Sequence, residues 1–540
     1  IVANFSYNSV PVIRHSRSRF DLSHGRKTSG NVGTLYPFEV QEVYPGDTFK
    51  LHTMAVTRLT SQFLKPVMDN LFLDMYYFYV PSRLLYDKYQ NIFGENTESA
   101  WANTQEYAVP TVYGTVPEGS VGDYLGLPTK QAIPAGNAVS VLPFRAFAKI
   151  YNEWFRDENN IDPMHIQQGA KAASESFNSN AWAPNNYFGK PPHVGKLRDY
   201  FTSCLPAPQK GDAPAVFQGL APVVTGDPHE VSGNPMSLVD DDGSSPLTGN
   251  FIGFQNAAGR TFAMNASATG MGTMSAAGFA VPDNLYADMN GMGFTINDLR
   301  FAFQYQKMLE RQARSGSRFV EYLASTWGVS SGDTRLQRSE FLGGRRAPIT
   351  IQQVTQTTGA GSNLGDVGAY SLSNGRSRFT KSFVEPGYVI GVYCIRQMHT
   401  YQQGIERFWR RSKRIDFYDP VFANIGEQPV YKSELYAGAP SDSVFGYNEA
   451  WADLRARQSG VTGQMRSNSS AALDVWHFAD EYDNAPTLSQ TFVDETPQFV
   501  DRTISVQSTE QDQFILDFWI QNIAYRVLPT YSVPSLIDHN

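Results

Sequence analysis

The sequence has few cysteines and no long apolar run. Its two cysteines, Cys204 and Cys394, are too few for a disulfide framework and lack the CxxC spacing of zinc and redox sites. No apolar stretch reaches the roughly 20 residues that a membrane helix needs, and the first residues are polar rather than signal-like. We therefore expect a chain that folds in a reducing cytoplasm, is not secreted by the usual route and does not insert into a membrane.

Charge is also sparse. Charged residues make up 18% of the 540 residues, below the roughly 25% of an ordinary soluble domain, so more of the surface is available for contacts with neighbouring molecules. The net charge of −8 argues against a protein whose entire surface coats nucleic acid, because such binding needs clustered Lys and Arg. Any contact with nucleic acid must therefore be local.

Motifs of catalysis and metal binding are missing. There is no HExxH, Walker A or GxSxG pattern, and the nine histidines are scattered without the spacing of metal ligands. Asp240, Asp241 and Asp242 could together ligate a hard cation such as calcium, but we favour a solvated acidic turn. These patterns predict neither a cofactor nor enzymatic activity.

Aromatic residues, by contrast, are abundant at 13%, and they favour strands and protein contacts. Residues 35–44 and 48–59 have the pattern of strands, and Pro45-Gly46 between them fits a type II turn, which predicts a hairpin. Residues 379–384 and 388–400 are separated by a second Pro-Gly turn and predict another hairpin.

Further patterns indicate a layered β fold. Residues 71–80 are apolar on both faces, as in a strand buried on both sides, and residues 513–527 form another long strand pattern. Helices are predicted from Pro143 and, after an Asn297 cap, through residue 327 with a break at residues 315–317. Strands at both ends with helical connections predict a mainly β sandwich or jelly roll with elaborated loops.

The composition divides the chain into four parts. Residues 1–34 are polar and basic and predict an N-terminal arm. Residues 35–204 hold the first part of the β core, and residues 293–540 hold the second. Between them, residues 205–292 are rich in Gly, Ala and Ser with few charges, and a loop of this length is usually functional or disordered.

Basic residues are interleaved with aromatic ones in residues 401–418. Flexible single-stranded nucleic acid is held by phosphate attraction together with base stacking, and this segment offers both. The alternative, which the sequence leaves open, is that Phe408 and Trp409 belong to the core. The cations would then pair with Asp416, Asp419 or a neighbouring chain. The candidate DNA contacts are Arg14, Arg17, Arg19, Arg26 and Lys27 in the arm, and Arg407, Trp409, Arg410, Arg411, Lys413 and Arg414 in this cluster.

Short blocks along the whole chain resemble the major capsid protein of gokushoviruses, which are small icosahedral single-stranded DNA phages of the Microviridae. The order of the blocks is kept from end to end, and residues 205–292 are the part unlike a shared block. The blocks are Ser18–Gly25, Val43–Phe49, Met68–Asn70, Arg335–Gly344, Thr400–Gly404, Phe445–Glu449, Leu473–His477 and Tyr531–His539.

The resemblance implies an antiparallel eight-stranded jelly roll of the viral capsid type, with long inter-strand insertions that contain several helices. It implies self-assembly into a T=1 icosahedral shell around circular single-stranded DNA, with residues 205–292 forming threefold protrusions used in host attachment. The implied partners are an internal scaffolding protein, a DNA-pilot protein, a small DNA-binding protein and a host cell-surface receptor. The implied location is the virion, assembled in the cytoplasm of the bacterial host. From the basic motifs themselves, we expect the arm and the Arg407–Arg414 cluster to face the shell interior and contact the DNA.

An alternative that fits the aromatic-rich, acidic composition is a β-rich secreted carbohydrate-active enzyme or lectin. Such an enzyme needs two carboxylates across a cleft, about 5 to 9.5 Å apart, and a sequence cannot exclude that geometry. The absence of a signal-like N-terminus and the resemblance favour the capsid protein.

Overall fold

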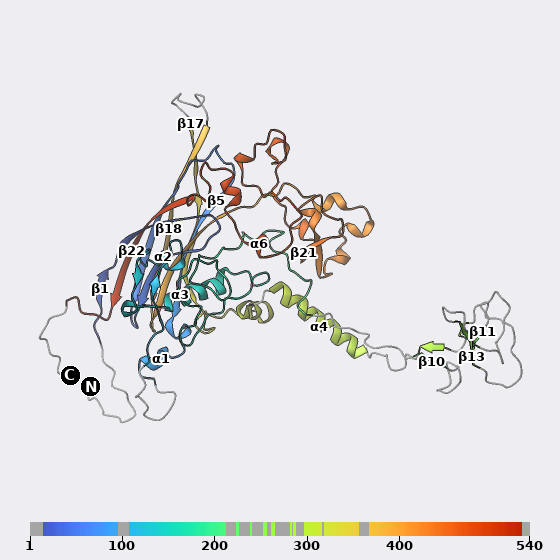
Figure 1. Cartoon of the computed structure of the whole chain (residues 1–540), viewed down its shortest axis with the longest axis horizontal. Helices are drawn as coiled ribbons and strands as arrows, with labels where there is room; N and C mark the ends of the chain where they lie inside the picture. Colours follow the sequence, from blue (N-terminus) through green and yellow to red (C-terminus); the bar gives the residue numbers. More distant parts are fainter. Residues whose placement is uncertain are drawn as a thin grey trace. The chain divides into compact units, whose positions relative to one another are not determined.

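Figure 1 shows the computed structural model of the chain. It contains two compact units, one formed by residues 1–210 and 310–540 and the other by residues 211–309. No helix in the described ranges is both long and apolar enough to cross a membrane. The structure describes residues 15–95, 107–211, 296–315, 318–355 and 367–531, together with the short strands β10 to β15.

The first unit is built on two antiparallel sheets, so the chain is mainly β. The larger sheet has six strands in the order β1-β22-β4-β18-β17, and β2 also pairs with β22 (Figure 1). Its strands are β1 (Ser18–Asp21), β2 (His24–Gly30), β4 (Thr48–Leu59), β17 (Ile351–Thr355), β18 (Val367–Ser382) and β22 (Phe514–Arg526).

The smaller sheet packs face to face on the larger one through a shared apolar core. Phe38 stacks on Phe518 of β22 with ring centroids 4.3 Å apart. The ring centroid of Tyr77 lies 5.3 Å from that of Phe379 of β18. The strand order is β16-β5-β19-β3, and the strands are β3 (Tyr36–Val43), β5 (Leu71–Pro81), β16 (Glu340–Ile349) and β19 (Gly387–Gln397).

A helical layer covers the outer face of the smaller sheet. It includes α3 (Leu142–Ile150), which continues as a π-helical turn that carries Trp154. Phe78 of β5 contacts Trp154 with ring centroids 5.3 Å apart. Arg145 of α3 is fully buried, and its Nε lies 2.7 Å from Oε1 of Glu175. Because both faces of β5 are covered, the prediction of a strand buried on two sides is confirmed.

Neither predicted hairpin exists. β3 and β4 lie in different sheets, and so do β18 and β19, which makes each Pro-Gly turn a corner between the sheets. The two corners contact each other: the N–H of Gly46 donates to the carbonyl oxygen of Phe383, and the N–H of Phe383 donates to that of Asp47, both at 2.8 Å. The turn chemistry is right, since Gly46 has a φ of +88°. A local turn pattern specifies a chain reversal but not the partner strand.

Part of the predicted N-terminal arm belongs to the larger sheet. β1 pairs with residues 523–526 of β22, and β2 pairs with residues 514–520 of the same strand. Residues 18–30 are therefore mostly sheet rather than a free arm. Their short, polar strands lack the apolar alternation that would have revealed them in the sequence.

Both predicted helices are present. α4 (Ile296–Ser315) begins one residue before Asn297, so Asn297 lies in its first turn and not at its cap, and the chain resumes as α5 (Phe319–Tyr322). The other elements of the first unit are α1 (Tyr89–Ile92), α2 (Val121–Tyr124), α6 (Gln490–Val493), α7 (Gln498–Asp501), β6 (Thr111–Val112), β7 (Gly114–Thr115), β8 (Ala132–Ile133), β9 (Val139–Ser140), β20 (Glu427–Tyr431) and β21 (Val444–Glu449). The second unit contains β10 (Val223–Thr225), β11 (Leu238–Val239), β12 (Ile252–Gln255), β13 (Thr261–Met264), β14 (Val281–Pro282) and β15 (Leu285–Ala287).

Candidate nucleic-acid interface

The basic segment that the sequence singles out is a loop between β19 and β20. Two short 3-10 turns, Arg407–Arg410 and Arg414–Asp416, shape it. The Asp416 carboxylate accepts the backbone N–H groups of Lys413 and Ser412 at 2.8 and 3.0 Å. These bonds lower the pKa of Asp416 because they stabilise its charged form. Asp416 thus fixes the turn through backbone groups.

Two arginines of this loop are held by the segment around Tyr431. The Arg407 Nη1 donates to the carbonyl oxygen of Pro429 at 2.9 Å. The Arg410 Nη1 donates to the Ser433 hydroxyl at 2.7 Å, and its guanidinium lies 4.6 Å from the centre of the Tyr431 ring. Both cations therefore already have partners within the subunit.

Of the three remaining cations of the loop, one has an ion-pair partner among the described residues and two do not. Arg411 forms an ion pair with Asp453. Lys413 and Arg414 are exposed, and neither forms an ion pair with a described residue. Trp409 is 73% exposed beside them, so the alternative that places it in the core is wrong. Pairing of a cation inside the subunit does occur, but through Asp453.

The candidates near the N-terminus point in different directions. Arg14 lies outside the described residues, and Arg17 is exposed near the Gly46 corner. Arg19 and Lys27 are exposed on the uncovered face of the larger sheet. Arg26, next to Lys27 in β2, faces the other way, with its guanidinium against Gly126. The strand alternation of β2 therefore separates two neighbouring candidates.

The aspartates considered for a metal ion, Asp240, Asp241 and Asp242, lie outside the described residues. Within the ranges that the structure describes, no group of three or more His, Cys, Asp or Glu side chains could hold a metal ion. Both cysteines are buried and free.

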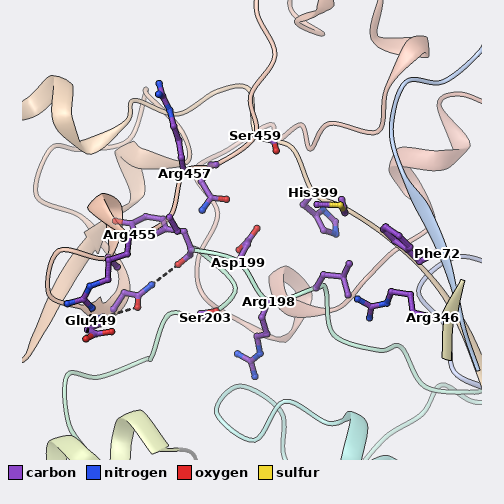
Figure 2. A pocket seen from close by; sticks show the side chains of 17 residues that line it. Phe72, Arg198, Asp199, Ser203, Arg346, His399, Glu449, Arg455, Arg457 and Ser459 are labelled. Carbon is purple, nitrogen blue, oxygen red and sulfur yellow. Dashed lines mark hydrogen bonds and ion pairs between the residues drawn. The ribbon is translucent and has the colours of Figure 1, made fainter. Parts of the chain in front are cut away.

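A polar cleft of about 690 Å³ lies beside this loop (Figure 2). Arg346 and Phe72 line one part of it, with the guanidinium 5.7 Å from the ring centre. Arg455 and Arg457 line another part. A second hollow of about 670 Å³ is lined by the same segment, residues 455–459, and also by Arg407. This segment was not among the candidates predicted from the sequence, although its two arginines one residue apart, Arg455 and Arg457, are visible there.

Ion pairs inside the subunit neutralise most cations of the cleft. The Arg346 Nε lies 2.7 Å from Oδ1 of Asp74, a carboxylate that is fully buried. The Arg455 Nη1 lies 2.5 Å from Oε1 of Glu449. Because these charges are matched internally, the cleft offers little net attraction for a polyanion.

His399 lies in the wall of the cleft and is locked in a buried network. Its Nδ1 lies 2.7 Å from Asp480 and its Nε2 lies 3.0 Å from Glu495, while Lys196 Nζ lies 3.0 Å from Asp480. Burial would lower the pKa of His399, but Glu495 and Asp480 raise it to about 9. A histidine with both ring nitrogens engaged joins chain segments and has no free nitrogen for proton transfer.

Comparison with known proteins decides the family. The family model described as "Capsid protein (F protein)" matches residues 8–536. The chain belongs to this capsid protein family. It is 38% identical over 549 residues to the "Capsid protein VP1" of Spiroplasma virus 4, covering 98% of this chain and 96% of the relative. It is 36% identical to the VP1 of Chlamydia phage 1 and 35% identical to that of Bdellovibrio phage phiMH2K, each covering 98% of this chain and 97% of the relative.

Membership of the capsid protein family decides between the functions that the sequence left open. The chain is a structural subunit of the Microviridae type, which confirms the resemblance seen in its short blocks. This structural role favours a capsid protein over a carbohydrate-active enzyme or lectin.

Proposed function

We propose that the chain is the repeating subunit of a T=1 icosahedral shell that encloses circular single-stranded DNA. The observation that carries this proposal is the match of one capsid family over nearly the whole chain. A closed shell repeats the same contacts between copies until no free edge remains. Each subunit then presents several contact surfaces to its neighbours.

An eight-stranded jelly roll as the wall of the shell is part of this proposal. β3, β4, β5, β16, β17, β18, β19 and β22 would form it, and β1 and β2 would extend its larger sheet. The paired corners at Gly46 and Phe383 support this assignment, because they carry consecutive strands from one sheet to the other.

Exposed apolar residues support contacts between copies. Val421 is 83% exposed and Ile415 is 67% exposed, and both lie with the exposed Phe417 in the loop between β19 and β20. Large exposed apolar groups gathered in one region usually mark an interaction site. Neighbouring subunits would cover residues 415–421 of this loop in the assembled shell.

The insertion is proposed to form the threefold protrusions and to contact the host cell-surface receptor. Residues 211–309 form a compact unit of their own, which is compatible with a part that can be displayed outside a wall. Residues 205–292, selected by composition, fall largely within that unit. Attachment would then be separable from the folding of the β core.

Within the basic loop, we assign the DNA contacts only to exposed side chains that have no ion-pair partner among the described residues. Trp409, Lys413 and Arg414 combine an exposed ring with two exposed cations that have no ion-pair partner among the described residues. The proposed partners in assembly are an internal scaffolding protein, a DNA-pilot protein and a small DNA-binding protein, in the cytoplasm of a bacterial host.

Electron cryo-microscopy of the purified assembled protein tests the proposal. We expect closed particles of uniform diameter with external knobs. A full-length chain that stays monomeric under every assembly condition, with and without single-stranded DNA, would contradict the shell.

A further inference from the structure

One face of the larger sheet is bare. Along β18, buried and exposed residues alternate from Ala369 to Thr380, and β4 and β22 alternate in the same way. The buried set packs on the smaller sheet, whereas the other set has no cover in the described chain. Trp519, at the middle of β22, is 49% exposed on this face. A sheet face that a subunit leaves open is available to a partner.

The bare face is basic although the chain as a whole is acidic. It carries six cations against two carboxylates, on a chain whose net charge is −8. The pairing register sets these residues on one side, because directly opposed residues of antiparallel strands share a face. The cations are Arg19, Lys27, Lys50, Arg58, Arg376 and Arg378, and the carboxylates are Asp21 and Asp517.

The arginines of β4 and β18 on this face are unpaired among the described residues. Arg58, Arg376 and Arg378 are exposed, and none forms an ion pair with a described residue. This differs from the polar cleft, where Arg346 and Arg455 have carboxylate partners. Unmatched guanidinium groups project a positive potential that matched ones do not.

Aromatic side chains lie among the cations of this face. Arg376 lies opposite Met54, which lies opposite Trp519 on its other side. Toward the start of β4, the Lys50 ammonium lies 5.4 Å from the centre of the Tyr525 ring. Residues two apart on a strand are about 6.7 Å apart and neighbouring strands about 4.8 Å apart, so several phosphates of one extended strand can reach cations at once.

A shallow hollow lies among these side chains. It measures about 480 Å³ and is lined by Lys50, His52, Arg378, Thr380 and Gln521, all outward-facing. Its walls therefore supply donors from three adjacent strands, two of which carry cations. A hollow with donors and no carboxylate is complementary to an anionic group.

We propose that this bare face, here named the basic sheet face, binds the phosphates and bases of the packaged single-stranded DNA without reading its sequence. The inference rests on the proposed shell and adds a site to it. Phosphate attraction together with stacking on rings such as Trp519 is the way single strands are held without sequence preference. A second copy that presents the same face does not fit, because two like-charged faces repel each other.

The test uses a triple variant of the full-length chain, Lys50→Gln with Arg376→Gln and Arg378→Gln. The matched control removes three positive charges from exposed residues elsewhere, Lys171→Gln with Lys190→Gln and Arg335→Gln. We expect shells of normal diameter that retain several-fold less DNA in the sheet variant and normal DNA in the control. Arg376→Lys with Arg378→Lys should retain DNA, because both charges remain.

A second readout applies to unassembled subunits, which bind a labelled single-stranded oligonucleotide at increasing salt. Loss of three phosphate contacts should make the slope of log affinity against log salt less negative by about 2, at roughly 0.7 per contact. Shells of the sheet variant with full DNA content, or subunits with an unchanged slope, would overturn the proposal. Loss of a co-purifying acidic protein with DNA content unchanged would also overturn it and identify a protein partner. Failure of the unaltered chain to form shells would instead contradict the proposed function.

Discussion

The N–H of Gly46 donates a hydrogen bond to the carbonyl oxygen of Phe383 at 2.8 Å, which joins the two corners that carry the chain between its sheets. Gly46 adopts a φ of +88°, and a Cβ at this position would lie 3.1 Å from Cγ2 of Val527. A side chain at Gly46 would therefore introduce both backbone strain and steric crowding at this contact.

Replacing Gly46 with Ala is expected to destabilise the subunit by about 1 to 2 kcal/mol, the cost of a left-handed conformation for a residue with a Cβ. Denaturant unfolding of purified subunits measures the change. Gly136→Ala is the control, since a Cβ there meets nothing within 4 Å and its φ is not in the left-handed region. Equal unfolding midpoints for the two variants would show that the corner is not strained.

Arg145→Met should destabilise the subunit by about 3 to 5 kcal/mol, because it leaves the buried Glu175 carboxylate without its cation. Thermal unfolding provides the comparison. The control is Arg457→Met, which removes a surface pair with Glu406 at 3.6 Å whose Arg side chain is 81% exposed, and which should change stability by less than about 1 kcal/mol. A similar loss in both variants would contradict the role of burial.

The network around His399 makes stability depend on pH in a defined direction. The folded-state pKa of about 9 exceeds the ordinary value of about 6.5, so this contribution is complete below pH 6.5 and is lost as the pH rises through 9. The pKa of Asp480 is lowered to about 2 by Lys196 and His399 against the effect of burial. Its contribution is present above about pH 3.9 and is lost as the pH falls through 2.

Melting temperatures measured between pH 6 and 9.5 test this expectation. The unaltered subunit should lose stability across that range, and His399→Gln should show a smaller loss because the titrating ring is gone. His15→Gln, at an exposed position, should follow the unaltered subunit. Parallel curves for all three proteins would exclude His399 as the source.

Neighbouring cations of the basic loop are expected to have different roles, one set in DNA retention and the other in subunit stability. Trp409→Ala with Lys413→Ala and Arg414→Ala should lower the DNA content of shells and leave assembly intact. Arg411→Ala should instead weaken the subunit by about 1 to 3 kcal/mol, because Asp453 loses its partner. DNA extraction from purified shells and thermal unfolding of subunits separate the effects. Normal DNA content in the triple variant would remove this loop from the proposed DNA contacts.

Deletion of residues 212–288 tests the proposed protrusion. Particles should still assemble, because the two sheets and their shared core lie outside this range, while attachment to host cells should fall. Electron micrographs and an adsorption assay with intact bacteria are the measurements. Misfolded subunits would show that the insertion supports the β core.

Individual elements were predictable from the sequence where one strong local pattern decided them. β5 and β22 have long apolar patterns, and α3 has an apolar face that begins at Pro143, so these elements were found. The partner of each strand depends on the core, which joins residues hundreds of positions apart. The same turn chemistry at Gly46 therefore predicted a hairpin where the structure has a corner.

The site could be predicted only in outline for a similar reason. The sequence selected Arg410 and Arg411 by their density, but Tyr431 and Asp453, which hold them, are distant in the chain. Arg376 and Lys50 were not selected, because they lie more than 300 positions apart in the sequence. The pairing of β18 with β4 brings such residues together.

The pairing of β1 and β2 with β22 has a consequence for the timing of biosynthesis. The earliest strands of the larger sheet wait for a partner that begins at Phe514, roughly 500 residues later. At about 5 to 20 residues per second on the ribosome, that wait lasts about 25 to 100 s. The sheet cannot be completed before residues 514–526 have been synthesised, so a partly made chain lacks the finished face that a neighbouring subunit or the genome would contact.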